Sequence, residues 1–145
     1  MLIDPGTGIV TVNPDLIVDP SRATGLFAAA DPADPGPGIP LAGDWRVFER
    51  RDVRDEAGRS LVLTVTREGA RLHEVRLVYR LPGEPESAGW ETWSREAEAA
   101  RQALHDMVLR ETLGPGPYRY PWGEVRSRYD ERGGFSLISV RYTGA

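Results

Sequence analysis

The sequence predicts an α+β fold in which an antiparallel sheet of about five or six strands packs on one long helix. Two observations support this prediction. Between residues 45 and 81, and again after Pro121, apolar and polar residues alternate between short turn-forming breaks, which is typical of strands joined by hairpins. Between residues 90 and 113 the apolar spacing changes to three and four residues, which indicates a helix. The chain has 145 residues, the size of one domain with a core of its own.

The first 43 residues form a Pro/Gly-rich, acidic segment of this single domain. They contain seven prolines and six glycines, and the run from Asp31 to Pro40 (DPADPGPGIP) excludes a helix or a central strand there. Before that run, the alternation over residues 8–13 predicts a short strand. Residues 20–30 are expected to form a short helix, with Ser21 as its N-cap.

Residues 44–145 carry the sheet and the helix. Strands are predicted over 45–53, 60–66 and 72–81, and the short connections between them indicate an antiparallel meander. In the third strand, Val75, Leu77 and Tyr79 alternate with polar residues and predict one apolar face.

The predicted helix runs from residue 94 to residue 113. Ser94 is its expected N-cap, and Gly114 followed by Pro115 ends it. Its apolar stripe is expected to face the sheet and consists of Trp90, Trp93, Ala97, Ala100, Leu104, Met107 and Val108. After the helix, residues 124–129 and 135–142 are predicted to form a hairpin in the same sheet, around a turn at 130–134.

Composition excludes several kinds of chemistry. The chain has no cysteine, and all 18 basic residues are arginine, so thiolate sites, disulfides and Schiff-base lysines are absent. The two histidines, His73 and His105, belong to no metal-binding motif and are expected to be structural. Ser136 and Ser139 lack a GxSxG frame. We therefore expect a non-enzymatic protein without catalytic residues, metal or cofactor; a small hydrolase that uses His73 or His105 with a carboxylate is the last alternative.

The net charge of −4 lies in the first part of the chain. Residues 1–43 hold five aspartates and one arginine, and the other 102 residues hold 17 acids and 17 arginines. This balance disfavours nucleic acid and predicts a protein partner with a basic face. The expected contact residues are Asp31, Asp34, Asp44 and Glu49. No apolar run is long enough for a membrane helix, and Asp4 and Pro5 interrupt any signal peptide, so we expect a cytoplasmic protein.

A resemblance adds a functional expectation for the C-terminal third. The segment contains W-x-x-W from Trp90, a helix that closes on Leu113-Gly114, and the pattern Y-P-W-G-x-V-x-S-x-Y-D-x-R-G-G-F-S from Tyr120 to Ser136. In these features it resembles small uncharacterised bacterial proteins of the toxin-immunity type. The resemblance implies a protein that binds and blocks a cognate toxin without chemistry of its own. An adaptor or chaperone for a secreted effector is the alternative.

Overall fold

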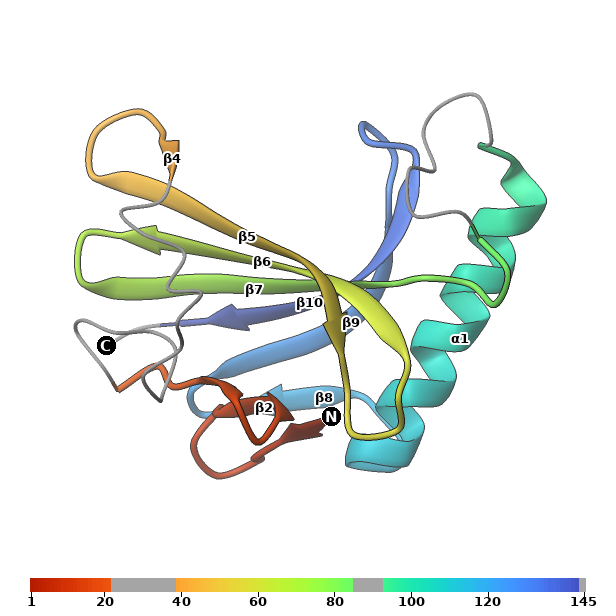
Figure 1. Ribbon diagram of the computed structural model, residues 1–145. Coiled ribbons are helices and arrows are strands. Elements are labelled where there is room, and N and C mark those ends of the chain that lie inside the picture. Colours follow the sequence, from red (N-terminus) through yellow and green to blue (C-terminus); the bar gives the residue numbers. More distant parts are fainter. Residues whose placement is uncertain (22–38, 85–92, 144–145) are drawn as a thin grey trace.

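The computed structural model describes residues 1–21, 39–84 and 93–143. Within these ranges the chain forms ten strands in two antiparallel sheets and the helix α1, Arg95–Leu113 (Figure 1). The predicted α+β class, with an antiparallel sheet packed on one long helix, is confirmed. The short helix predicted over 20–30 lies almost entirely outside the described residues.

The main sheet has seven strands in the order β4-β5-β6-β7-β10-β9-β8. Its strands are β4 (Ile39–Pro40), β5 (Trp45–Arg54), β6 (Ser60–Glu68), β7 (Arg71–Tyr79), β8 (Tyr118–Tyr120), β9 (Gly123–Asp130) and β10 (Phe135–Tyr142). The five long strands are those predicted from alternation. The predicted count of five or six is too low, because β4 and β8 are edge strands of two and three residues, too short for alternation to show.

The C-terminal hairpin lies inside this sheet, as predicted. Strand β10 pairs with β9 along its whole length and with β7 on its other side, where Ile138 lies opposite Leu77. At the turn, Asp130 Oδ1 accepts hydrogen bonds from the backbone N–H groups of Arg132 and Gly133. Gly134 then adopts a φ of 71°, a conformation that glycine takes without strain.

A second sheet of three strands comes from the N-terminal segment. It consists of β1 (Leu2–Ile3), β2 (Val10–Asn13) and β3 (Leu16–Val18). Strand β2 corresponds to the strand predicted over 8–13, whereas β1 and β3 were not predicted. Trp122 Nε1 donates to Pro5 O, and the Tyr142 hydroxyl donates to Gly8 O, each at 2.8 Å. These contacts dock the small sheet on the main one.

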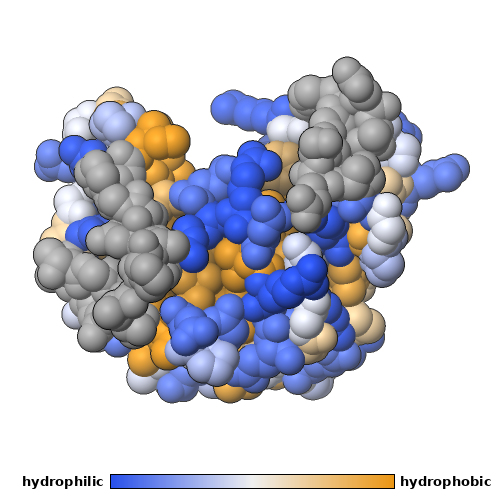
Figure 2. Space-filling view, in the orientation of Figure 1, coloured by the Kyte–Doolittle hydropathy of each residue, from blue (hydrophilic) through white to orange (hydrophobic). Residues whose placement is uncertain are grey.

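The two faces of the main sheet differ sharply. One face is apolar and forms the core beneath α1 and the small sheet; its fully buried residues include Leu61, Leu63, Val65, Val75, Leu77, Ile138 and Val140. The opposite face carries Glu74, Arg76 and the residues paired with them across the strands. In the space-filling view, hydrophilic and hydrophobic residues meet in a hollow of the visible surface (Figure 2).

Helix α1 has the predicted ends but not the predicted buried face. The Ser94 hydroxyl accepts from Ala97 N at 3.0 Å, and Gly114, with a φ of 76°, ends the helix. Met107 is 40% exposed, Ala100 is exposed and Leu104 is only partly buried. The buried residues are instead Glu98, Arg101, His105, Val108 and Leu109. The predicted stripe is therefore right at Val108 but wrong at Ala100 and Met107, which are exposed. Polar side chains paired with the strands take the buried positions in the first half of the helix.

Candidate functional site

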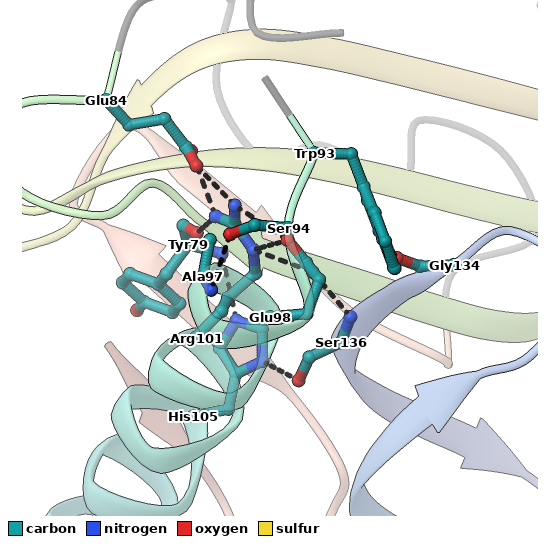
Figure 3. Close-up of polar contacts among 10 residues, drawn as sticks. All are labelled: Tyr79, Glu84, Trp93, Ser94, Ala97, Glu98, Arg101, His105, Gly134 and Ser136. Atoms are coloured by element: carbon teal, nitrogen blue, oxygen red, sulfur yellow. Dashed lines mark hydrogen bonds and ion pairs between the residues drawn. The ribbon is translucent and has the colours of Figure 1, made fainter. Parts of the chain in front are cut away.

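Two groups of polar side chains are candidates for a functional site. The first, which we call the helix network, lies between α1 and the sheet and comprises Glu84, Glu98, Arg101, His105 and Ser136, together with the backbone of Tyr79 (Figure 3). The second, the charged face, is the side of the main sheet that points away from α1. Their geometries lead to different roles.

His105 bridges β7 and β10 where their pairing ends. The ladder between these strands stops at Leu77 and Ile138. Beyond it, the Tyr79 N–H donates to His105 Nε2, and His105 Nδ1 lies 3.0 Å from Ser136 Oγ. Because an amide can only donate, Nε2 is the accepting nitrogen, and the ring proton of the neutral imidazole is on Nδ1, facing Ser136. Burial, with a smaller effect from the Arg101 charge, lowers the pKa of His105 to about 3, so the ring is neutral.

Arg101 and Glu98 satisfy the other backbone groups at this gap. Glu98 Oε1 accepts the Ser136 N–H at 2.9 Å, and Arg101 Nη1 donates to the Tyr79 carbonyl. The Arg101 guanidinium also pairs with Glu98 and Glu84 on its remaining edges. Side chains of α1 thus replace ladder hydrogen bonds where the two strands separate, which explains why these polar residues are buried.

The His105–Ser136 contact has a geometry unsuited to activating a nucleophile. A general base must offer a lone pair to the hydroxyl, but the nitrogen that faces Ser136 carries the proton. The lone pair of His105 is already occupied by the Tyr79 N–H, and both side chains are fully buried. Glu98 faces Arg101 and the Ser136 backbone rather than the imidazole. In this arrangement the pair holds the helix on the sheet.

His73, the other histidine, lies on β7 six residues before Tyr79, the residue whose N–H binds His105. It is half-buried, and its ring packs edge-on against Trp45 with the ring centroids 4.8 Å apart. The contact between His105 and Ser136 was not predictable, because 31 residues separate them and no sequence motif contains both. Among the described residues, no group of three potential metal ligands comes together.

The charged face consists of side chains aligned across the strands. Two rows follow from the register. The first row is Glu49, Thr64, Arg76, Ser139 and Arg126, on β5, β6, β7, β10 and β9. The second is Val47, Thr66, Glu74, Arg141, Glu124 and Arg119, which ends on β8. With strands about 4.8 Å apart, Glu49 and Arg126 stand roughly 19 Å from each other across the sheet.

Glu74 is the centre of this face and is only 4% exposed. Its carboxylate accepts from Arg76 Nε at 2.7 Å, from Ser139 Oγ at 2.6 Å and from Arg141 Nε at 3.2 Å. Arg128 Nη2 lies 3.8 Å away. Burial alone would raise the pKa of Glu74, but hydrogen bonds from Ser139 and Arg76 outweigh burial and hold the pKa below its usual range. Glu74 therefore stays ionised at neutral pH.

Of the four predicted contact residues, the structure describes Asp44 and Glu49, whereas Asp31 and Asp34 lie outside the described residues. Asp44 is exposed in the turn before β5, where its carbonyl accepts from Gly69 N at 2.9 Å. Glu49 is exposed on the charged face and accepts from Arg51 Nε at 2.7 Å. Five residues of extended chain span roughly 16 Å, so Asp44 and Glu49 do not form one compact acidic site.

Comparison with known proteins adds no relative. No protein-family model, no curated protein and no solved structure matches the chain. The resemblance to toxin-immunity proteins therefore remains a prediction from the sequence. Helix α1, the helix found in the described part of the chain, is not long and apolar enough to cross a membrane.

Proposed function

We propose that the protein is a non-enzymatic protein-binding domain, and most concretely an immunity protein that binds and neutralises a cognate bacterial toxin in the cytoplasm. The charged face supports this proposal. It presents glutamates and arginines in ordered rows on a regular sheet, on the side that α1 does not cover. A surface of mixed charge gives a protein interface both specificity and a defined orientation.

The helix network supports binding rather than hydrolysis. A hydrolase built on His105 would need the imidazole to reach a substrate, whereas His105 is fully buried and both ring nitrogens are used inside the protein. Binding and blocking a toxin requires no cofactor. On the charged face, by contrast, Glu49, Arg126 and Arg141 are exposed and can contact a partner.

The proposal is tested by co-expressing the protein with the product of the neighbouring gene in a cell that this product harms. We expect protection and a stable complex on size-exclusion chromatography. Arg95 and Arg110 are exposed on α1, away from the charged face. A variant with both changed to Gln controls for a change of charge outside that face and should protect as well as the wild-type protein. Unimpaired toxicity with no complex would refute the proposal. A complex in which the partner keeps its full activity would indicate the adaptor alternative.

A further inference from the structure

We infer that the arginines around Glu74 form a binding site for the carboxylate groups of an acidic segment on the partner protein. This inference rests on the proposed function, because it names the chemistry that the charged face recognises. The site consists of Arg76, Arg126, Arg128 and Arg141. Arg76 and Arg141 bond to Glu74, Arg128 lies within ion-pair distance of it, and Arg126 stands opposite Ser139 on the neighbouring strand.

Glu74 orders the arginines without using all their donors. Arg76 and Arg141 each donate to Glu74 through Nε. A guanidinium has five N–H donors, and its two Nη groups form a fork that matches a carboxylate. The Nη groups of these two arginines pair with no other carboxylate in the ranges that the structure describes. The guanidinium groups of Arg76 and Arg141 are thus held beside the buried Glu74 carboxylate, and their Nη donors can still bind a carboxylate of the partner.

Arg128 gives a second sign of unfilled binding capacity. Its Nη2 lies 3.8 Å from Glu74, beyond hydrogen-bond distance, and its Nε is buried without a hydrogen-bond partner in the described structure. A buried donor that lacks a partner is costly, typically by about 1–3 kcal/mol. A partner carboxylate that drew the Arg128 guanidinium into a pair would reduce this cost.

The local charge favours an anionic partner. The site has four arginines and one glutamate, so three positive charges remain, and the neighbouring Arg119 and Glu124 cancel each other. Arg126 is exposed, and Arg141 has half of its side chain accessible. Bidentate pairs between arginine and carboxylate are among the stronger charge-assisted hydrogen bonds, so each such pair adds both affinity and orientation.

A protein segment fits this surface better than nucleic acid does. The chain has a net charge of −4, which repels a long polyanion along its whole length, whereas a short acidic segment on a folded partner meets only the arginine site. Glu49 stands at the other end of the Arg76 row, which places opposite charges on one face. A folded partner can complement both ends at once, with carboxylates over the arginines and a basic group over Glu49.

The first measurement uses two probes that each carry five negatively charged backbone or side-chain groups. One is a C-terminally amidated peptide of five Gly-Glu repeats that carries fluorescein on its N-terminus, and the other is a fluorescein-labelled hexathymidylate. Fluorescence anisotropy at about 0.1 M salt compares their affinities for the full chain. We expect the peptide to bind more tightly. No peptide binding, or tighter binding of the hexathymidylate, would overturn the inference.

Matched variants separate the site from net charge. The triple variant Arg76→Gln, Arg126→Gln, Arg141→Gln should lower peptide affinity at least tenfold. The control Arg95→Gln, Arg110→Gln, Arg132→Gln changes the total charge equally at exposed positions elsewhere and should lower it less than threefold. Arg76→Lys with Arg141→Lys keeps the charge but removes the forks, and we expect a loss of several-fold. Equal losses in the triple variant and its control, or full affinity in the lysine variant, would refute the proposed geometry.

The natural partner then separates this inference from the proposed function. If the wild-type protein captures the product of the neighbouring gene and the triple variant captures it equally well, the arginine site is wrong and the proposed function stands. If the peptide binds in an arginine-dependent way but the gene product is neither captured nor neutralised, the site stands and the proposed function is wrong. Circular dichroism on each variant verifies that it is folded.

Discussion

The two faces of the main sheet use the same pair of residue types in opposite ways. Under α1, Arg101 pairs with Glu98 and Glu84 and donates through Nε, Nη1 and Nη2, so its whole guanidinium is used inside the protein. On the charged face, Arg76 and Arg141 donate to Glu74 through Nε only. A buried ion pair is therefore informative about function only through the donors that it leaves unused.

The same substitution, arginine to glutamine, should have opposite consequences on the two faces, and the larger effect on stability is expected at the buried Arg101. Arg101→Gln removes the charge between Glu98 and Glu84 and the bond to the Tyr79 carbonyl. Breaking a buried pair from one side typically costs about 3–5 kcal/mol of unfolding free energy. Urea denaturation followed by circular dichroism measures the loss. A cost below about 1 kcal/mol would show that the helix network does not hold α1 on the sheet.

A second comparison concerns two leucines of α1. Leu109 is 1% exposed, whereas Leu104 is only partly buried. Leu109→Ala should cost about 2–5 kcal/mol, and Leu104→Ala clearly less, because a cavity forms only where the side chain is enclosed. The difference between the two urea midpoints tests which side of the helix faces the core. If Leu104→Ala destabilised the protein more than Leu109→Ala, Leu104 would face the core, as the sequence predicts.

The fold was predictable where local sequence determines it. The turn at Asp130–Gly134, the N-cap Ser94 and the alternation in β6 and β7 are local signals, and the structure confirms each of them. The orientation of α1 was not predictable, because Glu98, Arg101 and His105 are buried only through partners that lie up to 38 residues away in the chain. Hydrophobic periodicity has no means of showing such pairing.

The candidate site was predictable only in part. Glu49 was chosen from its place at the start of a strand and lies on the charged face. The arginines around Glu74 come from β7, β9 and β10, and only the register that sets Arg76 opposite Ser139 brings them together. That register depends on the insertion of β10 beside β7, a long-range pairing that the spacing of residues along one strand does not contain.

The helix network should make stability depend on pH. The pKa of His105 is lowered from 6.5 to about 3, so between these values the unfolded chain binds a proton that the folded chain does not. Stability is therefore full above pH 6.5 and falls as the pH drops, by at most about 1.4 kcal/mol per pH unit for one proton. Urea denaturation at pH 7, 6, 5 and 4 measures this slope. His105→Gln should show a flatter profile down to pH 5; an unchanged profile in that variant would assign the acid sensitivity to other groups.

Binding kinetics test the acidic residues predicted from the sequence. With Asp31, Asp34, Asp44 and Glu49 changed to Asn or Gln, we expect association with a basic-faced toxin to slow about tenfold, because electrostatic steering acts mainly on the on-rate. The wild-type rate should also fall as salt shortens the screening length below its value of about 10 Å at 0.1 M. Stopped-flow fluorescence gives both rates. Equal rates for wild type and variant at low salt would rule out these residues as the steering group.

On the charged face, the loss of one arginine should change stability very little. Arg141→Gln is the same change as Arg101→Gln, but half of the Arg141 side chain is exposed, and Glu74 keeps its bonds from Arg76 and Ser139. An ion pair with an exposed partner contributes little, so we expect a loss of less than about 1 kcal/mol in the same urea assay. The acidic peptide should nevertheless bind this variant more weakly, since one of the two forks is gone. If Arg141→Gln destabilised the protein as much as Arg101→Gln, the arginines of the charged face would stabilise the fold as Arg101 does. Unused guanidinium donors would then not indicate a binding site.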